Sequence, residues 1–362
     1  ASTLAVGGAV TVTGDTIKID SANQAFYTAD RGGSSSYAIN RYYTAGTENW
    51  RVGLLNDSTS NFHIYDVVAS ASRLSIGTDG SLSTPTAGTS NVRFGVNAGN
   101  SITSGGTYNT VVGDEAGTDI TTGDSNTGVG YGSLNETTTG GSNTAIGVNS
   151  LEANTTGSNN TALGVQALDT NTTASNNTAV GYQSLLANTT GASNTAVGKG
   201  ALSTNTVGHR NTALGFEALE LTTASDNVAI GYKALDTTTT GSNNTAIGTE
   251  AMDANTTGSA NVAVGYRTLD ANTTGAGNVA VGQAALGANT TADNNTAVGK
   301  NALTANTTGT LNTAVGKASL DANTTGDYNV AIGDDALGAN TTADGNTAVG
   351  SAALTLNTTG AN

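Results

Sequence analysis

The side chains that most often perform catalysis or bind metal ions are scarce in this chain. Its 362 residues include two histidines and no cysteine, which excludes thiol nucleophiles, thiolate ligands and disulfides. His63 and His209 are 146 residues apart. No carboxylate pair is marked by its spacing as the acid and base of a glycosidase. We therefore expect two ordinary histidines and no enzymatic activity.

The aspartates of the second half of the chain raise the question of calcium. They follow neither the D-x-[DN]-x-[DN]-G order nor the G-G-x-G-x-D order of known calcium loops. We therefore interpret them as scattered, solvated acids and expect no metal site and no cofactor. The aspartates in question are Asp226, Asp253, Asp270, Asp293, Asp321, Asp334, Asp335 and Asp344.

Aromatic side chains recur at one position of an internal repeat, directly after a glycine. Such a column, if it points outward, can stack on sugar rings of a receptor. The alternative is that the rings pack against a neighbouring chain or the next repeat. The candidate binding residues of the column are Tyr131, Tyr182, Phe216, Tyr232 and Tyr266. Three further candidates, Tyr42, Tyr43 and Trp50, lie near the N-terminus.

The repeat that carries this column spans residues 91–362. Its consensus is N-T-A-V-G-x-x-A-L-x-x-N-T-T-G-x-x, and it occurs in 16 copies that begin at Asn91 and end with the copy at Asn346. The step is 17 residues nearly everywhere, with 18 at the first step and 16 between Asn211 and Asn227. We number its positions 1 to 17 from the first asparagine. A fixed period of this length indicates one structural unit per copy.

Each unit is predicted to be one coil of a parallel β-solenoid. Two glycines with several Asn and Thr disfavour a helix, whereas N-T-A-V-G alternates as a strand does. We expect two short strands and two turns per coil, with positions 2 and 4 facing inward. The position 3 alanines would then form an outer row that another chain can approach closely. Because one coil buries little, we expect an oligomer.

The Asn-Thr-Thr triplets at positions 12 to 14 allow three interpretations. They match the acceptor sequence for N-glycosylation. Their regular threonine columns are also found in ice-binding solenoids, although here the threonines sit in a turn. We favour a turn in which the Asn and Thr side chains bond to backbone groups and stack in ladders.

Residues 1–90 do not repeat and are predicted to form an all-β module, so we divide the chain into 1–90 and 91–362. The module holds half of the aromatic residues of the chain. Its strand-like runs are separated by Gly, Asn, Asp and Ser. The runs are Ala9–Thr13, Thr16–Ile19, Gln24–Thr28, Tyr37–Tyr43, Trp50–Leu55, Phe62–Val68 and Arg73–Ile76.

Charge and hydropathy exclude two classes of partner. The net charge is −15, which disfavours contact with a nucleic-acid backbone. No apolar run reaches the ~18 residues of a membrane span, so we expect no membrane insertion in this segment. The chain begins at Ala1 without the features of a signal peptide, and we expect it to be a piece of something longer.

The repeat resembles a known family. Units such as Asn177–Leu185 (NTAVGYQSL) and Asn244–Met252 (NTAIGTEAM) are similar to the N-x-A-[VI]-G-x-x-[SA] units of YadA-type trimeric autotransporter adhesin heads, which also occur in bacteriophage tail fibres. The resemblance covers residues 91–362. It implies a left-handed parallel β-roll in each chain and a homotrimer around one axis.

A second, looser similarity favours the virion. The stretch from Trp50 through Phe62-His-Ile-Tyr-Asp to Leu74-Ser-Ile-Gly is similar to segments of phage tail fibres. We therefore expect an extracellular tail-fibre segment that displays a surface for a host glycan or protein receptor and contacts other virion proteins. The alternatives are the head of a trimeric bacterial adhesin, on the cell surface, and an ice-binding solenoid.

Overall fold

The computed structural model describes residues 38–44, 47–54, 61–76, 82–83, 90–102 and 105–360. The chain divides into two compact units, residues 1–85 and 86–362. The expected strands Ala9–Thr13, Thr16–Ile19 and Gln24–Thr28 lie outside the described residues.

The first unit contains a five-stranded antiparallel sheet in chain order, β1-β2-β3-β4-β5. Register shifts follow Tyr42 in the first strand and Ile64 in the third. The first four strands overlap the four remaining runs expected from the sequence. The strands are β1 (Ala38–Thr44), β2 (Thr47–Leu54), β3 (Phe62–Asp66), β4 (Ala71–Ile76) and β5 (Leu82–Ser83).

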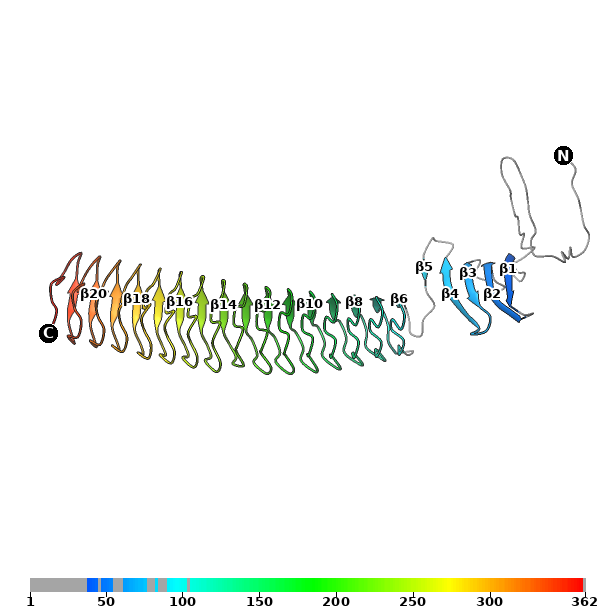
Figure 1. Cartoon of the computed structure of the whole chain (residues 1–362), viewed down its shortest axis with the longest axis horizontal. Coiled ribbons are helices and arrows are strands. Elements are labelled where there is room, and N and C mark those ends of the chain that lie inside the picture. The colour runs from blue at the N-terminus through cyan, green and yellow to red at the C-terminus, as the bar shows by residue number, and fades with distance from the viewer. Residues whose placement is uncertain are drawn as a thin grey trace, which may run out of the picture. The chain divides into compact units, whose positions relative to one another are not determined.

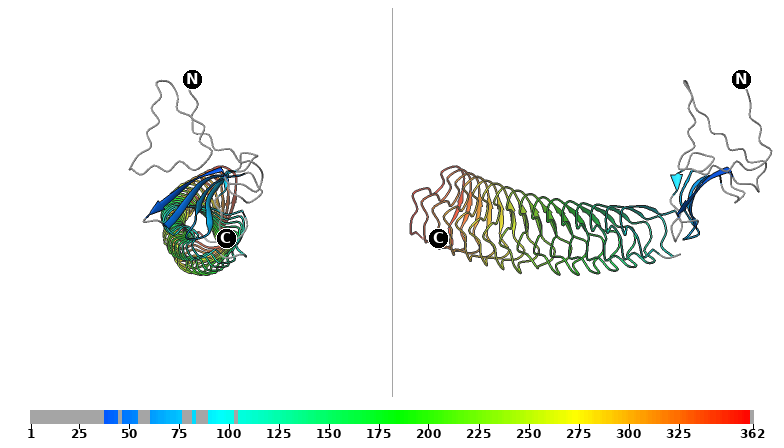
Figure 2. Two further views of the ribbon diagram at one scale, coloured as in Figure 1. Left: turned by 90° about the vertical axis from the view of Figure 1, so that its right-hand side faces the viewer. Right: turned by 45° about the vertical axis from the view of Figure 1, so that its right-hand side comes forward.

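The second unit is a parallel β-solenoid with one three-residue strand per coil, which confirms the fold predicted from the period. All 16 strands form a single sheet in chain order, stacked along one axis (Figure 1). The coils lie behind one another when viewed along the stack (Figure 2). The strands are β6 (Val92–Phe94), β7 (Thr110–Val112), β8 (Thr127–Val129), β9 (Thr144–Ile146), β10 (Thr161–Leu163), β11 (Thr178–Val180), β12 (Thr195–Val197), β13 (Thr212–Leu214), β14 (Val228–Ile230), β15 (Thr245–Ile247), β16 (Val262–Val264), β17 (Val279–Val281), β18 (Thr296–Val298), β19 (Thr313–Val315), β20 (Val330–Ile332) and β21 (Thr347–Val349).

The expected second strand of each coil is absent from the described solenoid. Positions 7 and 9 adopt left-handed backbone angles, as in Asn149 (φ 53°) and Leu151 (φ 51°), so this segment cannot be extended. It is still bonded to the next coil, because the Leu151 N–H donates to the Ala167 carbonyl at 2.9 Å. The coil therefore keeps an inter-coil ladder of hydrogen bonds without a second sheet.

The predicted orientation of the strand is wrong. Position 3 faces the interior, where Ala145 is wholly buried, and position 4 faces outward, where the Ile146 side chain is 39% exposed. The leucine at position 9, such as Leu151, is also wholly buried and fills the interior beneath the sheet. Only a small side chain then fits at position 3. The alanine row is thus part of each chain's own core and offers no surface to a second chain.

The first two coils reach the same packing with a different sequence. They carry Gly99 and Gly117 at position 9, where later coils have Leu or Met. The space is filled by Ile102 and Ile120 at position 12, which are buried where most later coils have asparagine. A Cβ on Gly99 would lie 2.7 Å from Cδ1 of Ile102. The isoleucine and the glycine therefore compensate for each other.

The short coil, 211–226, absorbs its missing residue in the turn that ends the coil. The side-chain amide of Asn211 donates to the Ala224 carbonyl at 2.8 Å, as Asn194 does to Gly208 in the preceding coil. The backbone ladder also continues, from the Thr223 N–H to the Thr239 carbonyl at 3.0 Å. The omitted residue therefore falls between Thr223 and Ala224.

Candidate binding surfaces

The glycine at position 5 places the next side chain on the outside of the coil. Gly147 has a φ of 137°, a conformation that side chains rarely adopt, and a Cβ there would press on the Gly164 carbonyl. The strand ends at this glycine. Position 6 then points into solvent, and the five aromatic residues of the column are all exposed: Tyr131, Tyr182, Phe216, Tyr232 and Tyr266.

Two rings of this column stack on each other across adjacent coils. The centroids of Phe216 and Tyr232 are 5.4 Å apart and their planes differ by 11°. The Lys199 ammonium lies 5.2 Å from the Phe216 centroid, on the preceding coil. For this pair, the rings therefore pack against the next repeat, which is the alternative to an outward-pointing column given above. Tyr131 has no aromatic residue at position 6 of either neighbouring coil, where Asp114 and Val148 stand.

Charged side chains line the coil next to the column, at positions 7 and 10. Lys233 lies 3.2 Å from Glu217 and 3.1 Å from Asp236. Arg267 contacts Glu250 of the preceding coil at 2.5 Å, and its guanidinium also lies 5.4 Å from the Tyr266 ring. In both cases a base at position 7 bonds to the acid at position 7 of the coil before it.

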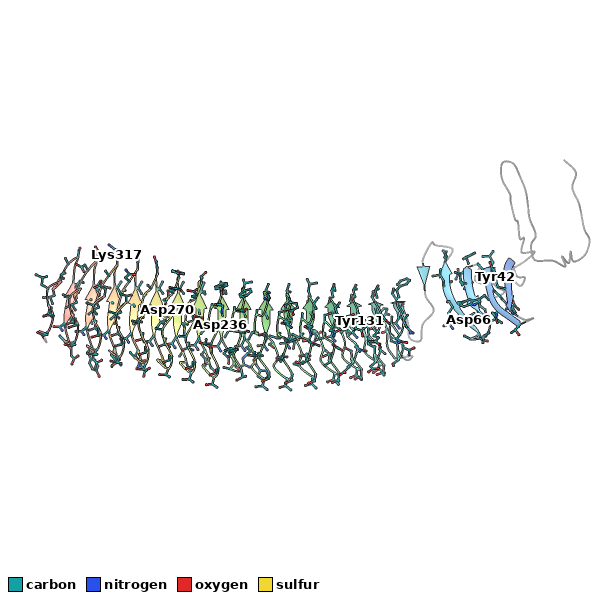
Figure 3. The ribbon with its side chains drawn as sticks, in the orientation of Figure 1. Tyr42, Asp66, Tyr131, Asp236, Asp270 and Lys317 are labelled. Atoms are coloured by element: carbon teal, nitrogen blue, oxygen red, sulfur yellow. The ribbon has the colours of Figure 1, made fainter. Side chains whose placement is uncertain are left out.

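Four consecutive coils carry a carboxylate at position 10: Glu220, Asp236, Asp253 and Asp270. Figure 3 shows Asp236 and Asp270 on the same side of the stack. Burial raises the pKa of Glu220, Asp253 and Asp270, and the Asp236 carboxylate adds to the rise at Glu220 and Asp253. Lys233 has a raised pKa because it bonds to Asp236 and Glu217.

This carboxylate row was missed in the sequence, where the acids were interpreted as scattered. Its signal was their shared position in the repeat, which becomes visible only when the coils are aligned. No group of three or more His, Asp or Glu side chains in the described part of the chain is placed to hold a metal ion.

The candidates of the N-terminal unit lie on its sheet. Tyr42 on β1 pairs directly with Trp50 on β2, and Trp50 pairs with Asp66 on β3, so the three share one face. Tyr42 is 52% exposed and Trp50 is 40% exposed. Arg73 binds Asp66 at 2.7 Å. The backbone of Tyr43 is in β1, but its side chain lies outside the described part.

Both histidine rings lie within hydrogen-bond distance of neighbouring groups of the chain. Ser72 Oγ lies 3.0 Å from Nδ1 of the buried His63. His209 accepts a hydrogen bond on Nδ1 from the Ala192 N–H, one coil earlier, at 2.9 Å. The two residues belong to different units of the chain.

Nine of the ten asparagines of the Asn-Thr-Thr triplets are buried, all except Asn357 of the last coil, which supports the turn interpretation over glycosylation of the folded chain. Asn171 is wholly buried, and its amide donates to Oδ1 of Asn154 at 2.9 Å and to the Ala174 carbonyl at 3.0 Å. The following Thr172 hydroxyl donates to the Thr189 carbonyl of the next coil at 3.1 Å. The Asn171 amide and the Thr172 hydroxyl therefore form their hydrogen bonds within the solenoid.

The outer face of the sheet β6–β21 is a second candidate surface. Positions 2 and 4 form it, and none of the 16 strands has a charged residue at either position. Position 4 is Val, Ile or Leu in every strand after β6. Position 2 is Thr in most strands, and hydroxyls such as that of Thr144 form no hydrogen bond within the described residues. We call positions 2 and 4 of these strands the sheet face.

Comparison of the chain with protein-family models, curated proteins and solved structures gives no match. Within the described residues, no helix is long and apolar enough to cross a membrane. The geometry of the two surfaces is therefore the basis for a functional proposal.

Proposed function

We propose that this chain is a structural and attachment segment of an extracellular fibre, in which the solenoid is a stiff spacer that holds a receptor-binding surface away from its anchor. The observation that carries the proposal is the sheet face. A chain with a net charge of −15 keeps this one face, 16 strands long, free of charge and lined with branched apolar side chains.

The dimensions of the sheet face suit self-association. Sixteen strands at about 4.8 Å spacing and three residues at about 3.3 Å give a face of roughly 77 by 10 Å. Its area of about 770 Å² is close to the ~800 Å² that each partner buries in a standard interface. A second copy of this chain has the same rise per coil and can match it coil for coil.

We further propose a homotrimer of left-handed rolls around an axis parallel to the stack, as the resemblance to adhesin heads implies. In a closed ring of three identical chains, each sheet face turns toward the axis and contacts both neighbouring chains, which leaves no open end. The contact is the sheet face, in place of the buried alanine row. The acidic turns then stay in water on the outside, where a fibre meets its surroundings.

The mass in solution tests the assembly. A trimer has three times 35.5 kDa, or 106.5 kDa, by light scattering. Attachment is tested separately, by the binding of the labelled chain to bacterial cells, whose surface glycans or proteins are the proposed receptors. A folded monomer contradicts the trimer, and a trimer that binds no cell surface contradicts the attachment role.

Origin in a bacteriophage tail fibre is our first choice, because of the similarity of residues 50–77 to fibre segments. The head of a bacterial adhesin has the same assembly. The two origins predict different neighbours: other virion proteins for the fibre, and a membrane anchor for the adhesin.

Ice binding is a second candidate, favoured by the unbonded hydroxyls of the sheet face. Thr144 and Thr161 stand one coil apart, beside Ile146 and Leu163, so hydroxyls and methyl groups alternate on a regular lattice. A monomer that inhibits the growth of ice crystals supports this candidate. The trimer excludes it, because the same face is then covered.

A further inference from the structure

The sheet of the first unit places two aromatic side chains beside an ion pair. Tyr42 on β1, Trp50 on β2 and Asp66 on β3 are direct cross-strand partners and form one row on one face. Such partners have Cβ atoms about 4.5–5.5 Å apart. Arg73 on β4 extends the row, because its Nη2 and Nε donate to Oδ2 of Asp66 at 2.7 and 3.2 Å. We call these four residues the Trp50 row; Figure 3 labels two of them, Tyr42 and Asp66.

Both aromatic side chains of the row are open to solvent. Tyr42 is 52% exposed and Trp50 is 40% exposed. Within the described residues, no ring or cation stacks on either of them. The Arg51 guanidinium lies 5.9 Å from the Tyr65 ring, but both residues point to the opposite face, since each follows or precedes a member of the row along its strand. The row therefore offers two unoccupied aromatic side chains.

The polar end of the row is held in place. Oδ1 of Asp66 accepts a hydrogen bond from the Ala69 N–H at 3.0 Å, and Oδ2 accepts from Arg73. These bonds lower the pKa of Asp66, so its carboxyl group is ionised. A carboxylate has about four acceptor positions and a guanidinium has five N–H donors, so both groups keep hydrogen-bonding capacity. The Arg73 side chain is 53% exposed. An acceptor and a donor are thus presented side by side.

We propose that the Trp50 row binds a neutral pyranose ring of a surface glycan, stacked on Trp50 with two adjacent hydroxyls on Asp66 and Arg73. A sugar hydroxyl both donates and accepts, so one hydroxyl bonds to the carboxylate and its neighbour accepts from the guanidinium. The apolar side of the sugar packs on the indole. The charges of Asp66 and Arg73 cancel, which favours an uncharged ligand. Tyr42, one strand further, can stack on the next sugar of the glycan.

The inference rests on the proposed attachment function and names the chemical class of the receptor. The competing occupant is an apolar surface of a second copy, because Val52, Ile64 and Leu74 form the next row of the same face. An apolar partner that also covers the Trp50 row would remove water from Asp66 and Arg73 without replacing its hydrogen bonds, which is costly. A sugar replaces that water with hydroxyls. The polar end therefore favours the glycan.

The test uses the fact that Trp50 is the only tryptophan of the chain, so its fluorescence reports this row alone. The full chain is titrated with three probes at millimolar concentration: methyl α-glucopyranoside, methyl β-galactopyranoside and methyl α-mannopyranoside. We expect at least one of them to change the Trp50 emission in a saturable way. Saturation-transfer NMR on the same probe then measures binding to the variants.

Trp50→Ala and Asp66→Asn should each weaken binding about tenfold, through the loss of the stacking contact and of the charged acceptor. Trp50→Phe keeps a ring and should bind within about threefold of the parent, so it separates loss of stacking from loss of the fold. Tyr131→Ala is the control, because Tyr131 is an equally exposed tyrosine of the solenoid, and it should leave binding unchanged.

The inference is overturned if no sugar changes the Trp50 emission, if Trp50→Ala binds as the parent does, or if Tyr131→Ala loses as much. It is also overturned if acrylamide fails to quench Trp50 in the assembled chain, which assigns this face to a contact between copies.

Cell binding and light scattering on the same samples separate this inference from the proposed function. A trimer that binds cells while no sugar changes the Trp50 emission overturns the Trp50 row alone. A chain that binds a sugar through Trp50 and Asp66 but binds no cell surface supports the row and overturns the attachment role.

Discussion

Asn143 and Asn126 occupy position 1 of adjacent coils, and the backbone N–H of Asn143 donates to Oδ1 of Asn126 at 3.0 Å. The amide of Asn143 also donates to the Gly157 carbonyl at 2.9 Å, near the end of its own coil. One wholly buried asparagine thus closes its coil with its side chain and joins it to the coil before with its backbone N–H. This double link repeats along the solenoid and replaces much of the apolar core that a coil of 17 residues cannot provide.

Replacement of this asparagine should therefore be costly. Asn143→Ala leaves the buried Asn160 N–H without its acceptor, whereas the Gly157 carbonyl keeps its bond from the Asn154 amide. At about 1–3 kcal/mol for the unpaired N–H and about 1 kcal/mol for the other lost hydrogen bond, we expect a loss of about 2–4 kcal/mol in the free energy of unfolding. Urea denaturation followed by circular dichroism measures it. Thr156→Ala, exposed in the same coil, is the control and should change stability by less than about 0.5 kcal/mol. Equal midpoints for the two variants would contradict the role of Asn143.

The glycine at position 5 should tolerate no side chain. Gly147→Ala adds a Cβ that presses on the Gly164 carbonyl, in a backbone conformation that alanine rarely adopts. We expect a loss of at least about 3 kcal/mol, seen as a lower thermal midpoint. Gly287→Ala is the control, because its Cβ would lie 3.3 Å from the Ala284 carbonyl and its φ is not positive. If both variants melt as the parent does, backbone strain at Gly147 is not what fixes the coil.

The sequence predicted the coil but not which face of its strand points to the interior. Asparagines equivalent to Asn143 and leucines equivalent to Leu151 recur at a fixed period, which defines the repeat. Alternation along the strand places Ala145 and Ile146 on opposite faces. Alternation does not say which face is inside, and the expectation that the larger side chain is the buried one is wrong here. The interior is narrow because Leu151 already fills it, so the alanine faces inward.

The left-handed angle at position 9 was hidden for a different reason. Leu151 has a φ of 51°, a conformation that leucine seldom adopts. The chain did carry a signal, since Gly99 and Gly117 stand at this position in the first two coils. These glycines share the backbone conformation of the leucines, with φ of 55° and 59°.

The aromatic column could be located from the sequence, and its internal contacts could not. Position 6 follows directly from the period. The stacking of Phe216 on Tyr232 depends on the orientation of the rings. The carboxylate row follows from the shared position 10 of its members, but the burial that raises the pKa of its acids does not. Nothing in the order of residues along one coil carries that information.

The carboxylate row should make the protein more stable in mild acid than at neutral pH. The pKa of Asp253 is raised in the folded chain, first by burial and then by the Asp236 carboxylate. The folded state then binds more protons than the unfolded state between the unfolded and the folded pKa. Stability falls as the pH rises through this window. We expect the thermal midpoint to increase from pH 7 towards pH 4.5, and Asp253→Asn to raise the midpoint at pH 7.

The contribution of Asp226 to stability should depend on pH with the opposite sign, so Asp226 serves as the control. Its hydrogen bonds to Arg210, at 2.6 and 2.8 Å, lower its pKa. The stability from this pair is present above the unfolded pKa and is lost as the pH falls through the folded pKa. Asp226→Asn should therefore lower the midpoint at pH 7. An Asp253→Asn variant that is also less stable at pH 7 would show that the row is not destabilising.

Charges placed on the sheet face should dissociate the proposed trimer without unfolding the coil. Ile146 and Ile247 are exposed at position 4, so lysine at both positions meets solvent in the single chain and an apolar partner in the assembly. An uncompensated charge in a dry interface costs several kcal/mol. We expect I146K/I247K to have a mass of 35.5 kDa by light scattering, one third of the trimer mass, with the circular dichroism of the parent.

The control variant carries the same charges in the turn. Thr156 and Thr257 are exposed at position 14 of the same two coils, and their side chains form no hydrogen bond within the described part of the solenoid. T156K/T257K should therefore remain a trimer. A trimer that survives I146K/I247K would place the contact elsewhere on the chain. Dissociation of both pairs of variants would show that added charge alone is responsible. Only the loss of the trimer in the first pair, with its retention in the second, assigns the interface to the sheet face.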